Sequence, residues 1–285
     1  MIQYLTAADF ANTIRLMRTL NKGSVLVVEG QTDATVYKRF IDVNTCKIIP
    51  VYGKENAVNA LRILEDDDYG GILAIVDADF WHLEGIKPES LNLLLTDTHD
   101  LETMIISTAK ALEKILDELG SANKIKQLHH PVIQLVLEAT LPIGLLRWIA
   151  SPFKDNLPLK FMYLNFDNFV DKPKLKVNIN KLLKEVRANS GNPGFDEDSI
   201  KKKIKSLIKN SHNPWQVCSG HDMVRILAIG FQFVFGNRKA ITLTSEVLEG
   251  ILRVAYEYSH FRLSRLHDSI ENWEKTNPGY KVLKP

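Results

Sequence analysis

Acidic side chains stand directly after three apolar segments of the 285-residue chain. They are Glu29 after SVLVV, Asp77 and Asp79 after GILAIV, and Asp100 and Glu102 after LNLLL, within the turn TDTHDLE. Apolar runs of this kind are typical of buried parallel strands, whose carboxyl ends meet at one edge of a sheet. We therefore expect these carboxylates to lie close together. They would repel one another unless a hard divalent cation, Mg²⁺ or Mn²⁺, binds between them.

Asp33 is a further candidate, since it lies one turn beyond Glu29 at the start of a predicted helix. Each acid also has an ordinary explanation, because Asp33 or Asp79 can cap a helix and Asp100 can be an N-cap. A glutamate directly after a buried strand is not a capping position, and the recurrence of acids at corresponding strand ends favours a metal site. The predicted ligands are Glu29, Asp33, Asp77, Asp79, Asp100 and Glu102.

The segments that must position these acids alternate between strand and helix. Strands are predicted in SVLVVEG, KIIPVYG and GILAIVDADF, with a fourth candidate over residues 91–95. Helices are predicted over 7–20, 32–41, 55–66 and 101–119. This alternation predicts an α/β fold: a Rossmann-like parallel sheet with helices on both faces.

After residue 120 the alternation ceases and helical patterns dominate. Helices are expected over 131–150, 180–188, 198–209, 222–235, 245–259 and 262–275, with a single stray strand over 159–164. The turn-rich stretch 188–198 is predicted to be a loop. We therefore predict an α/β domain over residues 1–120 and a mainly helical domain over residues 121–285.

The net charge of +2 conceals an asymmetry along the chain. Residues 62–102 contain eleven acidic and two basic residues, whereas residues 171–209 contain eleven basic and five acidic residues. The basic stretch ends in a run formed by Lys201, Lys202, Lys203, Lys205 and Lys209. Lys201, Lys202, Lys205 and Lys209 share one face of the predicted helix and could bind a polyanion, although a charge run can also be a solvated helix face.

The composition is that of a soluble globular protein, with 45% hydrophobic and 25% charged residues, which excludes disordered and fibrous classes. Two cysteines are too few for a disulfide framework, and a reducing cytoplasm is expected. The N-terminal sequence lacks the pattern of a signal peptide. The most apolar predicted helix, 131–150, is interrupted by polar residues and a proline, so no membrane span is expected.

Three segments together resemble the Toprim fold. They are VLVVEGQTD, the glycine-lysine turn VYGKENAV, and AIVDADF with its DxD pattern. This fold is shared by type I and II topoisomerases, bacterial primases and nucleases of the overcoming-lysogenization-defect type. TDTHDLE and the Gly-His-Asp motif in CSGHDMVRIL are similar to a branch of Toprim-like proteins encoded beside an ABC-type ATPase in phage-defence islands, which includes the nuclease effector of the PARIS system.

The resemblance implies roles for particular residues. Glu29 matches the Toprim glutamate that transfers protons and touches metal, and Asp77 and Asp79 match the metal-binding DxD pair. Lys54 could lie near a scissile phosphate, or it could be an exposed residue at a helix start. His99 is a second candidate for proton transfer, although a histidine in a turn is often only a hydrogen-bonding residue.

The Gly-His-Asp motif has two interpretations. His221 and Asp222 could contact substrate or lock the domains together, or Ser219 and Asp222 could form a capping box for the following helix.

The function implied by the resemblance is a Mg²⁺-dependent nuclease, the toxic effector of an antiphage defence system that is kept inactive by an ABC-type ATPase. RNA is the expected substrate, with transfer RNA as the specific expectation, and a homodimer is expected. Two alternatives stay open: a DNA-nicking endonuclease of the overcoming-lysogenization-defect type, or a catalytically weak regulatory module that docks on its ATPase.

Overall fold

The structure is a computed structural model that describes residues 5–20 and 22–285. Residues 1–4, on which part of the signal-peptide expectation rests, lie outside the described residues. Contacts divide the chain into two compact units. The first unit comprises Met1–Ala78, Ile86–Leu101 and Tyr256–Pro285, and the second comprises Asp79–Gly85 and Glu102–Ala255. These units are not the continuous stretches 1–120 and 121–285 predicted from the sequence, because the chain passes between them four times.

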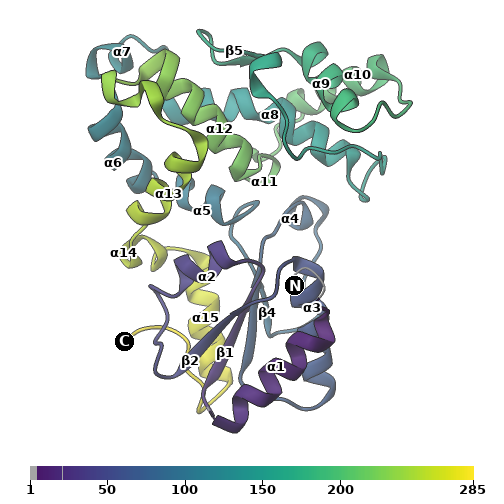
Figure 1. Cartoon of the computed structure of the whole chain (residues 1–285), viewed down its shortest axis with the longest axis vertical. Coiled ribbons are helices and arrows are strands. Elements are labelled where there is room, and N and C mark those ends of the chain that lie inside the picture. The colour runs from purple at the N-terminus through teal and green to yellow at the C-terminus, as the bar shows by residue number, and fades with distance from the viewer. Residues whose placement is uncertain (1–4, 21) are drawn as a thin grey trace. The chain divides into compact units, whose positions relative to one another are not determined.

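The first unit is built on a four-stranded parallel sheet (Figure 1). Its strands are β1 Ser24–Val28, β2 Cys46–Pro50, β3 Ile72–Val76 and β4 Leu93–Leu95, in the order β2-β1-β3-β4. Every residue of β1 and β3 is buried, because these central strands are covered on both faces. The α/β fold with a parallel sheet and the fourth strand are therefore confirmed.

The helices of the first unit connect the strands of this sheet, and the direction in which strands are added reverses after β2. They are α1 Ala7–Leu20, α2 Gln31–Tyr37, α3 Lys54–Asp66, α14 Tyr258–Phe261 and α15 Arg265–Thr276. The chain leaves β1 for β2 through α2 and returns past β1 to β3 through α3. Since such crossovers are right-handed, α2 and α3 cover opposite faces. α1 packs beside α3 (Figure 1), and α15 contacts β4. The reversal leaves a switch point between the carboxyl ends of β1 and β3, where open α/β sheets bind ligands.

The second unit is mainly helical, as expected for the C-terminal half. Its helices are α4 Trp81–Glu84, α5 Leu101–Ser107, α6 Lys110–Leu119, α7 Ala122–Lys126, α8 Val132–Ala150, α9 Ile179–Asn189, α10 Glu197–Lys209, α11 Pro214–Val217, α12 Gly220–Gly230 and α13 Ser245–Ala255, and a hairpin joins β5 Val170–Asp171 to β6 Lys176–Val177. α8 contacts α10, α11 and α12. Gly144 permits the close approach of α11, since a Cβ there would lie 2.4 Å from the Val217 carbonyl oxygen.

α8 is also the one described helix long and apolar enough to cross a membrane by length and composition. Its apolar window is 61% buried inside the protein, as in the core helix of a soluble protein.

Five predicted elements differ in the structure, two of them only in length. The helix predicted over 32–41 ends as α2 at Tyr37, and the helix predicted over 245–259 ends as α13 at Ala255. Residues 159–164 form a loop, so the prediction of a strand there was wrong. The helix predicted over 101–119 is interrupted before α6, where Ala109 has a left-handed φ of 59°. The helix predicted over 222–235 ends as α12 at Gly230 and continues as a π-helical turn, Phe231–Phe235.

Candidate functional site

Glu29 and Asp77 meet at the switch point of the sheet. They are the first residues after β1 and β3, which are neighbours. The Asp77 N–H donates a hydrogen bond of 2.8 Å to Glu29 Oε1. The Asp77 carboxylate accepts one of 3.1 Å at Oδ1 from the Leu101 N–H. The structure thus places the backbone of Asp77 against the Glu29 carboxylate and ties the turn before α5 to the Asp77 side chain.

Lys54 joins this group through the glycine turn after β2. Gly53 has φ 134° and ψ 154°, a conformation that favours glycine, and its N–H donates to the Glu29 carbonyl oxygen at 3.0 Å. Lys54 follows as the first residue of α3 and is half-buried. Its Nζ donates to the Asp77 carbonyl oxygen at 2.6 Å. The ammonium group is therefore turned inward to the acidic residues, not exposed at the helix start.

Asp33 acts at the start of α2. Its Oδ2 accepts a hydrogen bond of 2.7 Å from the Gly30 N–H, as a residue of the first helical turn commonly does. The same helix carries Tyr37, which is 2% exposed and whose hydroxyl has no hydrogen-bond partner among the described residues. Burial raises the pKa of Tyr37 well above its usual range, and the charges of Asp33 and Asp77 raise it further. Tyr37 was not predicted as a site residue from the sequence, although its i+4 spacing from Asp33 places both residues on one helix face.

The turn after β4 is packed against the end of β3. Thr96 Oγ1 accepts a hydrogen bond of 2.9 Å from the Ala78 N–H and donates one of 2.8 Å to the Thr98 carbonyl oxygen. His99 and Asp100 follow, and they are only 5% and 6% exposed. Both predicted residues are therefore buried parts of the first unit, unlike those of an open surface turn.

Asp79 belongs to the second unit, at the start of the segment that carries α4. Phe80 stands at the N-cap position of α4, so the capping explanation for Asp79 does not apply there. The backbone of Asp79 is left-handed, with φ 46°. Non-glycine residues in this region are uncommon and are found at functional sites. That Asp79 shares a metal with Asp77 stays a prediction.

Glu102 forms a second charged cluster, within the second unit. Arg253 Nη1 lies 3.7 Å from Glu102 Oε1 and 3.2 Å from Glu249 Oε1. His221 Nδ1 lies 2.9 Å from the same Glu249 oxygen. Burial raises the pKa of Glu249, but the hydrogen bond from His221 and the charges of His221 and Arg253 outweigh it, so this pKa is lowered.

Ligand atoms of Glu102, His221 and Glu249 lie within 4.8 Å of one another, close enough to hold a metal ion. The guanidinium of Arg253 already offsets much of the negative charge, so this cluster needs a metal less than an unpaired group of acids would. Glu249 and Arg253 were not predicted from the sequence. Their i,i+4 spacing on one helix is the only local signal of their pairing.

No model of a known protein family matches the chain, and no curated protein matches it.

Asp222 of the Gly-His-Asp motif lies in a buried ion pair. Its side chain is 1% exposed and accepts two hydrogen bonds from Arg147, of 2.7 Å from Nε and 3.0 Å from Nη2. This bidentate pair joins α8 to α12. Ser219 stands at the N-cap position of α12, but the Asp222 carboxylate is directed to Arg147. His221 differs, since its side chain is 65% exposed.

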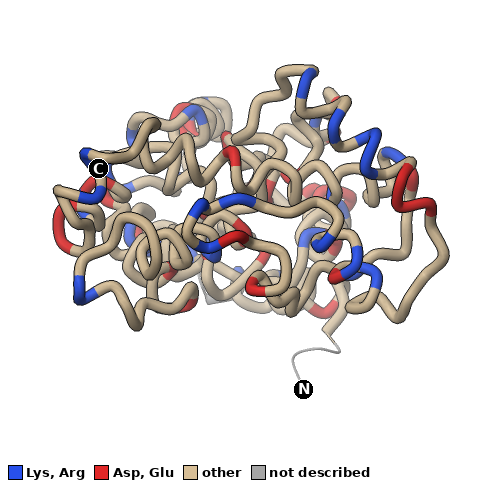
Figure 2. The backbone as a smooth tube through the Cα atoms, turned by 90° about the horizontal axis from the view of Figure 1, so that it is seen from above, with Lys and Arg blue, Asp and Glu red and all other residues tan. Residues whose placement is uncertain are grey.

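The basic run lies on α10 (Figure 2, Lys and Arg in blue). Its apolar face, Ile200 and Ile204, is buried. Lys203 is paired with Asp155 at 2.5 Å. We call the remaining lysines of α10 the lysine stripe; they are partly or fully exposed and comprise Lys201, Lys202, Lys205 and Lys209.

Proposed function

We propose that the protein is a metal-dependent nuclease with a Toprim-type active site, the toxic effector of an antiphage system in the cytoplasm. The observation that carries this proposal is the contact between Glu29 and Asp77 at the switch point of the sheet, with the Lys54 ammonium beside them. Two buried free cysteines, Cys46 and Cys218, are consistent with a reducing compartment.

The donor set suits Mg²⁺ or Mn²⁺. Glu29 and Asp77 offer carboxylate oxygens, the ligands that hard divalent cations prefer, and Asp33 belongs to the same acidic environment. The buried hydroxyl of Tyr37 has no hydrogen-bond partner among the described residues, and the charges of Asp33 and Asp77 act on it. We propose Asp100, which belongs to the same unit, as a further ligand. That Asp79 and Glu102 also bind the ion stays a prediction from the sequence. A bound divalent ion would supply positive charge to the phosphodiester transition state.

The side chains of the chain itself have distinct roles in this proposal. Glu29 transfers a proton, and the hydrogen bond from the Asp77 N–H fixes the orientation of its carboxylate. Lys54 binds the scissile phosphate, for which its position between α3 and the end of β3 is suitable. His99, buried in the turn after β4, is the second candidate for proton transfer.

The substrate and partners come from the family resemblance. We propose RNA, with transfer RNA as the specific target, an ABC-type ATPase that restrains the nuclease until infection, and a homodimer as the active form. The lysine stripe on α10 supports a polyanionic substrate, since exposed lysines at helical spacing can follow a phosphate backbone.

The deciding experiment is a cleavage assay with purified protein on total transfer RNA and on plasmid DNA, with Mg²⁺, with Mn²⁺ and with a chelator. We expect metal-dependent cleavage of RNA. Glu29→Gln should abolish it without changing the circular dichroism spectrum, because a strand-end carboxylate contributes little to packing. Glu89→Gln, at an exposed acid of the same unit, is the matched control and should leave cleavage unchanged.

Each alternative predicts a different result in the same assay. Nicked plasmid with intact RNA would identify a DNA endonuclease. No cleavage of either substrate, combined with unchanged toxicity of the Glu29→Ala variant in cells, would refute the catalytic assignment and favour a regulatory module.

A further inference from the structure

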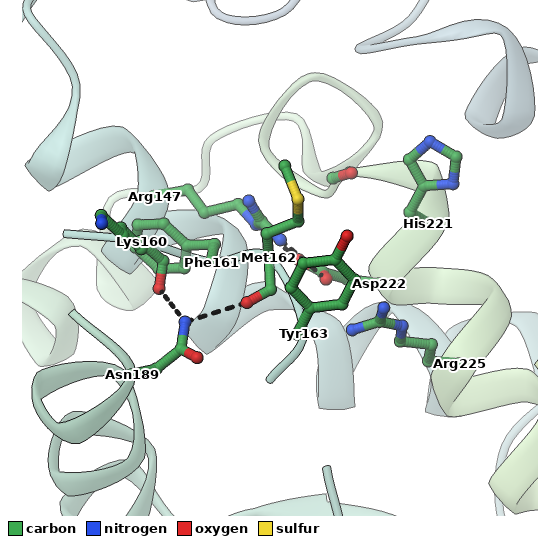
Figure 3. A pocket seen from close by; sticks show the side chains of 10 residues that line it. Arg147, Lys160, Phe161, Met162, Tyr163, Asn189, His221, Asp222 and Arg225 are labelled. Carbon is green, nitrogen blue, oxygen red and sulfur yellow. Dashed lines mark hydrogen bonds and ion pairs between the residues drawn. The ribbon is translucent and has the colours of Figure 1, made fainter. Parts of the chain in front are cut away.

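An open hollow of about 820 Å³ lies in the second unit, between the 160–163 loop, α9 and α12 (Figure 3). This volume is within the range of roughly 300–1,000 Å³ typical of small-molecule sites. Aromatic and cationic side chains line it, chiefly Lys160, Phe161, Tyr163 and Arg225. The wall therefore offers both flat apolar surface and positive charge.

The loop that carries the aromatic residues is held in place by polar contacts from the end of α9. The Asn189 side-chain amide donates to the carbonyl oxygens of Lys160 and Met162, at 2.8 and 2.9 Å (Figure 3). Ser190 Oγ accepts the Lys160 N–H at 2.8 Å. Tyr163 follows with a left-handed φ of 62° and is 83% exposed. A large ring that is exposed on a fixed loop is a ready platform for stacking, since little conformational freedom is lost on binding.

The charge of the hollow is positive, because its one carboxylate is already neutralised. Asp222 is bound by Arg147, whose guanidinium lies 4.6 Å from the centre of the Phe161 ring. Arg225 extends from α12 toward Tyr163 (Figure 3). Within the described part of the chain, no carboxylate lies within ion-pair distance of Arg225 or Lys160, and the charge of Glu246 acts on Arg225 only at longer range. The ligand that fits such a wall is flat, aromatic and anionic, which is the chemistry of a nucleotide.

We propose that this hollow binds one unpaired nucleotide of a single-stranded RNA segment, with the base stacked on Tyr163 and the phosphate bound by Arg225 and Lys160. The identity of the strand as RNA rests on the proposed function. Stacking and phosphate contacts tolerate any base, so the hollow would position the strand without reading its sequence. A free mononucleotide has the same chemistry, and the experiment separates the two sources.

The test uses the full chain with Glu29→Gln, in a chelating buffer, and a short fluorescein-labelled single-stranded RNA followed by fluorescence anisotropy. Tyr163→Ala should weaken binding by about 5- to 150-fold, as removal of one base stack does, whereas Tyr163→Trp should preserve it. Arg225→Gln should reduce the slope of log K against log salt by about 0.7, and Tyr163→Ala should leave this slope unchanged. The matched control is Arg238→Gln, at an exposed arginine of the same unit, which should bind as the parent does.

Two results would overturn the proposal: RNA affinity unchanged in both Tyr163→Ala and Arg225→Gln, or a parent protein that binds adenosine monophosphate more tightly than it binds the single-stranded RNA. Failure of the nuclease proposal is distinguishable from these. A protein that cleaves RNA but binds it independently of Tyr163 refutes the hollow alone. A protein that does not cleave, yet binds RNA through Tyr163, refutes the nuclease alone.

Discussion

Replacing Asp222 with asparagine separates a structural role of the Gly-His-Asp motif from a role in substrate binding. The carboxylate is 1% exposed and is bound by two nitrogens of Arg147. An asparagine side chain has nearly the same shape but no charge, so Arg147 would be left without its counter-ion. We expect Asp222→Asn to destabilise the second unit.

The magnitude follows from the burial of the two partners. Breaking a buried ion pair by removing one charge costs about 3–5 kcal/mol. The Arg147 side chain is 24% exposed and can recover part of its hydration, and an amide oxygen can still accept one hydrogen bond. We therefore expect a loss of about 2–4 kcal/mol, which for a unit of this size lowers Tm by roughly 4–16 °C.

Thermal unfolding followed by tryptophan fluorescence measures this loss, because Trp148 of α8 is buried close in sequence to Arg147. The double variant Arg147→Met with Asp222→Leu should be more stable than Asp222→Asn, since it leaves no buried charge unpaired. Glu118→Gln breaks an exposed pair with Lys239 and should not change Tm. An Asp222→Asn protein that unfolds at the wild-type temperature but no longer binds RNA would refute this reasoning and assign Asp222 to the substrate.

Three further predictions concern the metal, the polyanion and the buried thiol. In calorimetric titration, Asp77→Asn should weaken Mn²⁺ binding more than Asp33→Asn, because Asp33→Asn mainly weakens the hydrogen bond to the Gly30 N–H at the start of α2. Equal affinities of the two variants for Mn²⁺ would contradict the proposed metal geometry. Glutamine at all positions of the lysine stripe should flatten the dependence of log K for RNA on log salt by about 0.7 for each phosphate that the stripe neutralises; an unchanged slope would make the stripe a solvated helix face. Burial raises the pKa of Cys46 to about 12, so the native thiol should resist alkylation at mildly alkaline pH, and stability should fall as pH rises above the unfolded thiol value of about 8.5; rapid alkylation of the native protein would contradict this.

The sheet could be predicted because its central strands are buried on both faces. β1 and β3 must then be continuous apolar runs, which mark their own ends, and the residues after those ends fall at the switch point. The contact of Glu29 with Asp77 follows from that logic alone. After residue 255 the chain returns to the first unit, and α15 packs against β4. This contact could not be predicted, because a helical pattern contains no information about which sheet the helix covers.

The wrong predictions for residues 159–164 and for Asp222 have the same physical origin, because contacts between residues far apart in the sequence determine both structures. Residues 159–164 have the apolar content of a strand, but hydrogen bonds from Asn189 hold them as a loop with an exposed tyrosine. Asp222 has the spacing of a capping box, but its partner Arg147 lies 75 positions away in the sequence. Local periodicity contains no information about either partner.

The charges of the chain impose two opposite ionic requirements on the proposed nucleic-acid ligand. Around the switch point, the acids Glu29, Asp33 and Asp77 lie with the cation Lys54, so an approaching phosphodiester is repelled unless a divalent cation binds there. The hollow of the second unit and the lysine stripe have the opposite sign, and their attraction for a polyanion weakens as monovalent salt is added. Raising salt at constant Mg²⁺ should therefore reduce binding and cleavage together. Removing Mg²⁺ at constant salt should abolish cleavage while the hollow still holds the strand, a separation that a module which only binds RNA would not display.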